Sequence, residues 1–199
     1  QPRGLVTDSD AVYWATGGAS GAVRKLALDG GAPVTLASGS FSFIAAVASD
    51  GQHVYWGSNG REVYRTHVDG GLVTRVAYNL PSVVALAVDG DSVYAGGDQW
   101  VVRLDKAAAE QDGGALVAIN QHEVRTLVVS PNYVFWTNYA NGSPDGSVML
   151  APKDGGPAEA FSAFESGPYG LALDGTRLYW TTTDGPDGGV RYGDLPYGP

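Results

Sequence analysis

Two arginines and a tyrosine recur at one position of a repeated pattern, two residues before an aliphatic side chain. In chain order the position holds Arg3, Ala45, Val84, Arg125 and Tyr169. Two guanidinium groups and a phenol would suit a ligand that carries a carboxylate or a phosphate. The alternative is that the arginines pair with Glu123, Glu165 or backbone carbonyls.

The three histidines are His53, His67 and His122. None has the nearby second histidine that a histidine metal site normally shows. His122, next to Glu123 and close to Arg125, is the one arrangement that could serve acid–base chemistry, with an exposed loop histidine as the alternative. We therefore predict no catalytic residue and no metal ligand, and we add His122 and Glu123 to the candidate ligand-binding residues.

Aspartate-rich turns at 141–146 and 184–189 raise the question of calcium. Calcium takes about six to eight oxygen ligands, and these turns alone supply only a few, so turn chemistry explains them better. We expect no cofactor, with calcium as the alternative. The chain has no nucleophile elbow, phosphate loop or dinucleotide fingerprint, but a site that draws single residues from several segments would leave no such motif.

Composition points to an all-β chain with few helices. The 199 residues include 29 glycines and 11 prolines, and only 17% are charged. The net charge of -9, without a basic cluster, would repel nucleic acid. No segment is long and apolar enough to span a membrane. The absence of cysteine excludes disulfides and thiolate metal sites but does not fix the compartment. Because the chain opens at Gln1 and not at Met, we expect a processed protein that is secreted, periplasmic or on the cell surface.

The elements that must position these residues follow from a repeat. Aromatic pairs occur at Tyr13-Trp14, Tyr55-Trp56, Phe135-Trp136 and Tyr179-Trp180, and their tryptophans are 42, 80 and 44 residues apart. The double gap predicts a degenerate copy, which Tyr94-Ala95 supplies. Each copy follows an apolar run that ends in Asp or Ser, and most third and fourth strands are joined by Asp-Gly-Gly.

Four short antiparallel strands per unit of about 42 residues are typical of a propeller blade. We predict one all-β domain, a β-propeller with five blades at about 1–40, 41–80, 81–121, 122–166 and 167–199. Adjacent aromatic residues point to opposite faces of a strand, so each blade packs aromatic bulk against both neighbours. Most blades are expected to have four antiparallel strands. We expect the last blade to end with three strands, unless a fourth was lost by processing or is supplied by another chain.

In a closed ring, blades four, five and one are consecutive, which would bring Arg125, Tyr169 and Arg3 into one sector. The segments "LYWTTTDG" and "VFWTNYANG", preceded by "LALDG" and "LVVSP", resemble the YWTD repeats of LDL-receptor-type β-propellers and their bacterial relatives. That family usually has six blades, whereas this chain has five. The resemblance implies the propeller fold and a habit of binding proteins or small ligands.

We expect an exported, non-catalytic binding module for a protein or a small, possibly anionic ligand. One alternative is a lectin in which Trp100, Tyr139 or Tyr192 stacks on a sugar ring. Another is a lyase or hydrolase with its active site at the channel mouth, as on other propellers.

Overall fold

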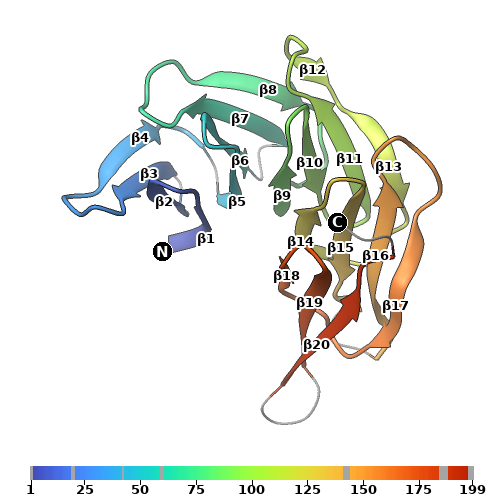
Figure 1. The fold of residues 1–199 in the computed structure, drawn as a ribbon. Coiled ribbons are helices and arrows are strands. Elements are labelled where there is room, and N and C mark those ends of the chain that lie inside the picture. Colours follow the sequence, from blue (N-terminus) through green and yellow to red (C-terminus); the bar gives the residue numbers. More distant parts are fainter. Residues whose placement is uncertain are drawn as a thin grey trace. The chain divides into compact units, whose positions relative to one another are not determined.

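The computed structural model describes residues 2–18, 21–41, 43–58, 61–140, 144–183 and 188–196. Twenty β-strands occur in this part of the chain, and it contains no α-helix, so the expected all-β class is confirmed. The strands form five sheets that follow one another along the sequence (Figure 1). Residues 141–143 and 184–187 of the predicted turns at 141–146 and 184–189 lie outside the described residues.

The sheets contain three to five strands each. The first consists of β1 (Pro2–Thr7), β2 (Ala11–Thr16), β3 (Ala22–Ala27) and β4 (Val34–Ser38). The second consists of β5 (Ile44–Ser49), β6 (His53–Ser58), β7 (Glu62–His67), β8 (Thr74–Tyr78) and the short β12 (Gln111–Asp112). The third consists of β9 (Ala85–Val88), β10 (Ser92–Gly96), β11 (Trp100–Asp105) and β13 (Ala115–Ile119).

The fourth sheet consists of β14 (Val124–Val129), β15 (Tyr133–Asn138), β16 (Gly146–Pro152) and β17 (Glu159–Glu165). The fifth consists of β18 (Leu171–Leu173), β19 (Arg177–Thr182) and β20 (Gly189–Asp194), so the expected three-stranded last sheet is present in the described residues. The chain divides into two compact units. Unit 1 comprises residues 1–95 and 103–115, and unit 2 comprises 96–102 and 116–199.

The second sheet has five strands, one more than most of the sheets. There β12 pairs in parallel with β8, through Gln111 with Ala77 and Asp112 with Tyr78. Asp112 therefore does not begin a tight hairpin like those at Asp29, Asp69 and Asp154. In those three turns both glycines have positive φ, as at Gly30 (104°) and Gly31 (108°), which a side chain would oppose.

The aspartate that ends each apolar run closes the turn between the first and second strands. Asp50 Oδ1 accepts hydrogen bonds from the backbone amides of Gln52 (3.0 Å) and His53 (2.7 Å), and its Oδ2 accepts one from Tyr55 Oη (3.0 Å). Asp174 binds the turn amides and Tyr179 in the same way. The tyrosine of the aromatic pair thus holds its own sheet's turn.

The fourth sheet lacks both partners of this hydrogen bond. Its turn residue is Ser130, which has no carboxylate for a phenol, and its aromatic residue is Phe135, which has no hydroxyl. Ser130 Oγ still accepts a hydrogen bond from the Tyr133 amide (3.1 Å). Both partners of the pair are absent together, so no buried hydroxyl is left without a partner there.

The aromatic pair also packs each unit's sheets together. In unit 1, Tyr13 and Val23 of the first sheet share a core with Val47 and Trp56 of the second. In unit 2, Phe135 and Val148 of the fourth sheet pack against Trp180 of the fifth. The tyrosine or phenylalanine therefore faces the following sheet and the tryptophan the preceding one, which confirms the prediction of opposite faces.

In each sheet, the third strand along the chain has a valine at its second or third position. It is fully buried at Val23, Val63, Val101 and Val148 but 72% exposed at Val190. We expect Val148→Ala to lower the free energy of unfolding by about 2 kcal/mol, since it opens a cavity between two sheets. Val190→Ala is the matched control and should cost less than about 0.5 kcal/mol in the same urea titration. Equal losses would contradict this packing.

Candidate functional site

Arg125 lies at a β-bulge in β14 of unit 2. The pairing of β14 with β15 slips by one residue between Val124 and Leu127. The same irregularity occurs in β1 between Arg3 and Leu5. Bulges turn a side chain out of the regular strand direction, which explains why this position of the repeat differs from its neighbours. Arg3 and Arg125 lie within their strands and not ahead of them.

Arg125 is held by two aromatic rings and a carboxylate. Its guanidinium carbon lies 5.0 Å from the ring centre of Tyr139 and 5.9 Å from that of Tyr169. The two rings meet edge to face with centres 5.8 Å apart. Arg125 Nη2 lies 3.3 Å from Glu123 Oε2. The Arg125 side chain is 34% exposed, so the pair is partly open to solvent.

Two loops carry the residues around this cluster. Glu123 and Ala140 both have positive φ, at 58° and 50°. The Tyr139 amide donates to the Glu123 carbonyl (3.1 Å), and the Ala140 amide donates to the His122 carbonyl (3.2 Å). These bonds tie the end of β15 to the chain before β14. The two hydrogen bonds help to offset the cost of placing two non-glycine residues at positive φ.

Gln121 holds the segment of His122 and Glu123 against the core of the fourth sheet. Its Oε1 accepts hydrogen bonds from the indole of Trp136 (2.7 Å) and from Asn138 Nδ2 (3.0 Å), while its Nε2 donates to the Ile119 carbonyl (2.9 Å). Gln121 is buried. A core tryptophan of the fourth sheet therefore fixes the segment that carries His122 and Glu123.

These loops border a pocket of about 640 Å³ within unit 2. Its lining consists of Asp98, Gln99, Gln121, His122, Glu123, Ala140 and Asp145. The Glu123 amide donates to the Asp98 carbonyl (2.7 Å), which holds the β10–β11 turn against the pocket. Three carboxylates, two amides and an imidazole thus surround a space large enough for a side chain or a small polar ligand.

Four of the five predicted residues therefore come together. His122 and Glu123 line the pocket, and Arg125 and Tyr169 lie in the adjoining cluster. Arg125 makes the ion pair that the sequence left as its alternative reading. Arg3 belongs to unit 1, where it borders a small pocket with Pro2, Leu5 and Trp14. A sector shared by Arg3 and Arg125 stays a prediction.

Tyr139, Gln121 and Asp98 are functional candidates that we did not place at the site from sequence. In the lectin alternative, the residues expected to stack on a sugar are Trp100, Tyr139 and Tyr192. Trp100 is 7% exposed at the start of β11 and cannot stack on a ligand, so that expectation is wrong. Tyr192 is 59% exposed, in β20.

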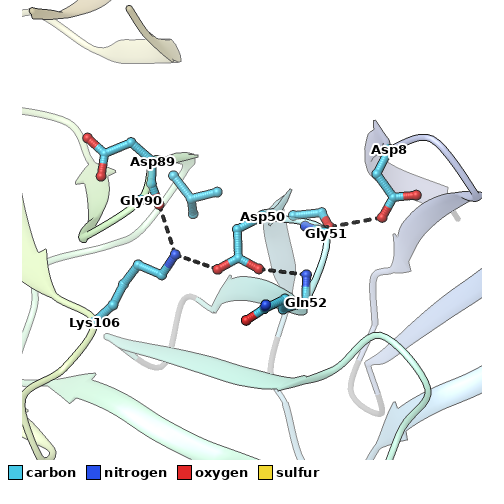
Figure 2. Close-up of a pocket in the computed structure, with 9 residues that line it drawn as sticks. Asp8, Asp50, Gly51, Gln52, Asp89, Gly90 and Lys106 are labelled. Carbon is cyan, nitrogen blue, oxygen red and sulfur yellow. Dashed lines mark hydrogen bonds and ion pairs between the residues drawn. The ribbon is translucent and has the colours of Figure 1, made fainter. Parts of the chain in front are cut away.

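A second polar pocket, of about 570 Å³, lies in unit 1 where three first strands end. Figure 2 shows Lys106 between Asp50 and the backbone beside Asp89. Lys106 Nζ lies 2.5 Å from Asp50 Oδ2 and donates to the Asp89 carbonyl (2.8 Å). Burial acts to raise the Asp50 pKa, but hydrogen bonds from Lys106 and from the turn amides outweigh it and lower this pKa to about 2. These groups satisfy one another, which indicates a structural role.

Metal ligands do not gather in the described ranges: no three His, Asp or Glu side chains there lie close enough to hold an ion. The same part of the chain has no helix that is long and apolar enough to cross a membrane.

No protein-family model matches the sequence, and no curated protein matches it. A chain in the crystal structure of a nidogen/laminin complex superposes with a TM-score of 0.75 at 16% identity, over 91% of this chain and 72% of that one. The computationally designed protein Ika8 superposes with a TM-score of 0.68 at 18% identity, over 100% of this chain. This chain spans 59% of the Ika8 chain. Together with the five successive sheets, these likenesses show that the protein has a β-propeller fold.

Proposed function

We propose that the chain is a non-catalytic binding module, a relative of the YWTD-type propellers, which binds a protein partner through the pocket of unit 2. The partner would insert a basic or donor-rich segment between Asp98, Glu123 and Asp145. The observation that carries this proposal is the charge of the lining: among the described residues of the pocket wall there are three carboxylates and no lysine or arginine.

Electrostatics favours a cation over the anion that the two arginines suggested. Arg125 lies beside the pocket, but its charge is already balanced by Glu123 at 3.3 Å. An anion would have to compete with that carboxylate and approach two more. The net charge of -9 extends the same preference to longer range. A lysine or arginine side chain would instead gain charge-assisted hydrogen bonds.

The structural likeness is compatible with a protein partner. One superposed chain belongs to a complex of nidogen with laminin, so a chain of this fold is known in a protein–protein assembly. At 16% identity this likeness supports the fold alone. The proposal of a basic protein partner is based on the acidic lining of the pocket.

Fluorescence anisotropy with labelled hexalysine and hexaglutamate peptides tests this proposal. Wild-type protein should bind hexalysine at about 50 mM salt and lose most of that affinity near 300 mM, as screening increases. Asp98→Asn should weaken binding by about fivefold, the equivalent of about 1 kcal/mol for a partly exposed pair. Asp29→Asn removes the same charge from an exposed turn in unit 1 and should change the affinity less than twofold.

Glu123→Gln should change peptide binding more than Asp98→Asn does. It removes one pocket carboxylate and, in the same step, leaves the Arg125 guanidinium without its ion pair. Hexalysine binding should fall by about tenfold, and hexaglutamate binding should appear. Arg125→Met should leave hexalysine binding intact or strengthen it. Preferential binding of hexaglutamate by the wild type, abolished by Arg125→Met, would refute the cationic partner and support the anionic one.

A carbohydrate is the second candidate, since the pocket combines carboxylates with the amide of Gln99, and Tyr169 beside it is 53% exposed. Such groups accept and donate hydrogen bonds to sugar hydroxyls. A glycan array with wild-type protein and Tyr169→Ala separates the two candidates. Binding that depends on Tyr169 and not on salt would favour the sugar.

A further inference from the structure

We propose that His53 and His67 form a binding site for a divalent transition-metal ion, copper(II) above all, on the second sheet of unit 1. The two residues lie directly opposite each other, His53 at the start of β6 and His67 at the end of β7. Their ring centres are 5.8 Å apart, with an angle of 85° between the ring planes. Two imidazoles that bind one ion through nitrogen atoms about 2.1 Å from it have ring centres about 5 to 6 Å apart. The pair thus has the spacing of a shared ion.

The strand register brings the two side chains together. The Val68 amide donates to the Gln52 carbonyl (2.9 Å), so the next pair, His53 with His67, is of the non-hydrogen-bonded kind. Side chains of such pairs are the closest in an antiparallel ladder. The sequence shows no short spacing between these histidines, because a hairpin turn separates them and only the register makes them neighbours.

Each imidazole has a carboxylate beside its Nδ1 atom. His53 Nδ1 lies 4.0 Å from Asp50 Oδ1, and His67 Nδ1 lies 3.6 Å from Asp69 Oδ2. Histidines that bind a metal commonly turn their second nitrogen toward a carboxylate, which favours the ring proton there and makes the metal-binding nitrogen more basic. This arrangement leaves the Nε2 atoms of both rings for the ion.

A lysine holds each of these carboxylates by its other oxygen. Lys106 Nζ lies 2.5 Å from Asp50 Oδ2, and Lys25 Nζ lies 3.2 Å from Asp69 Oδ1. In both cases one carboxylate oxygen faces the lysine and the other faces the histidine. Asp50 and Asp69 are therefore positioning residues, and the positive charge of each lysine is already balanced.

The protonation states of the two rings also suit a metal, which binds neutral imidazole. Burial is the main cause that lowers the pKa of His53, and the charges of Arg65 and Lys106 act in the same direction, against Asp50. His67 Nδ1 accepts a hydrogen bond from the Asp69 amide (3.2 Å). An ion at Nε2 requires the ring proton at Nδ1 instead, and there the Asp69 carboxylate accepts it.

The site is open to solvent, with the His53 side chain 33% exposed and that of His67 53% exposed. Within the described ranges no third His, Asp or Glu completes a set of protein ligands, so water fills the remaining positions. Imidazole suits copper, nickel and zinc, and Cu²⁺ binds such ligands most tightly among the divalent ions. Calcium and magnesium prefer oxygen ligands.

Copper(II) chloride alone is the probe, added to the intact protein at pH 7. Substoichiometric Cu²⁺ should broaden the NMR signals of His53 and His67 first, and the electron paramagnetic resonance spectrum should show two nitrogen ligands. Zn²⁺ should compete with an affinity at least about tenfold lower, and Ca²⁺ should not compete. Broadening centred on His122, or on the turn residues Asp29 and Asp154, would overturn the proposal.

Calorimetric titration of variants tests the ligands one by one. His53→Gln and His67→Gln should each weaken Cu²⁺ binding by about tenfold or more, whereas His122→Gln, which removes the remaining imidazole, should change it less than twofold. Asp69→Asn should weaken binding by about tenfold and shift the ring ¹⁵N signals of His67 in the Zn²⁺ form. Asp29→Asn, at the corresponding turn of the first sheet, is its matched control. Equal losses in all three histidine variants, or no loss in His53→Gln and His67→Gln, would refute the site.

Discussion

Trp136→Ala is expected to lower the free energy of unfolding by about 4 kcal/mol, the largest effect of any substitution considered for this protein. The indole is fully buried in the middle of β15. It also donates the 2.7 Å hydrogen bond to Gln121 that holds the loop of His122 and Glu123. The substitution should therefore reduce both stability in urea denaturation and hexalysine binding.

Trp136→Phe separates packing from the hydrogen bond. It keeps most of the apolar volume, and the loss of the N–H should contribute about 1 kcal/mol of a total near 2 kcal/mol. Trp100→Phe is the control, because Trp100 is also buried but its indole nitrogen has no hydrogen-bond partner in the described part of the chain. If Trp100→Phe costs as much as Trp136→Phe, the bond to Gln121 has no measurable role.

Lys106→Met should lower the free energy of unfolding by about 3 kcal/mol at pH 7. The substitution leaves the Asp50 carboxylate buried without its cation, which is costly even when amides remain. Asp50 and Lys106 side chains are only 13% and 14% exposed. Lys25→Met is the matched control, since Lys25 makes similar bonds to Val68 and Asp69, but Asp69 is 73% exposed. It should cost less than about 1 kcal/mol.

The same ion pair sets a pH dependence. The folded-state pKa of Asp50, about 2, lies below its ordinary value of 3.8. A lowered pKa stabilises the protein above about pH 4, and that contribution is lost as pH falls from 4 towards 2. The difference between wild type and Lys106→Met should therefore shrink in denaturation at pH 3. A difference that is constant from pH 7 to pH 3 would contradict the role of Asp50.

The number and order of the sheets could be predicted from the sequence, because the aromatic residues that pack between sheets recur at a regular spacing. The aromatic pairs predict four of the sheets, and the doubled gap predicts the third, which consists of β9, β10, β11 and β13. The described part of the last sheet has the three expected strands, within the predicted blade at 167–199. The sequence also contains a signal for the aspartate–tyrosine hydrogen bond in the turns. Asp and Tyr are five residues apart in four repeats, and in the remaining repeat Ser130 and Phe135 replace both of them.

Only part of the site could be predicted from the sequence, because contacts made by loop residues do not recur at a regular sequence spacing. Arg125 and Tyr169 were found through their place in the repeat, and His122 and Glu123 through their proximity to Arg125. Gln121 acts through side-chain bonds to Trp136 and Asn138, which no spacing reveals. Likewise β12 joins the preceding sheet through a pairing between residues more than thirty positions apart.

The central claim, that the acidic pocket of unit 2 is the binding surface, is tested most directly by NMR titration of the intact protein with hexalysine. The account predicts that the backbone shift changes centre on Gln99, His122, Glu123 and Ala140, and that in Glu123→Gln about tenfold more peptide is needed to produce them. Changes spread over the exposed turn aspartates Asp29, Asp69 and Asp154, or none at millimolar peptide, would contradict it.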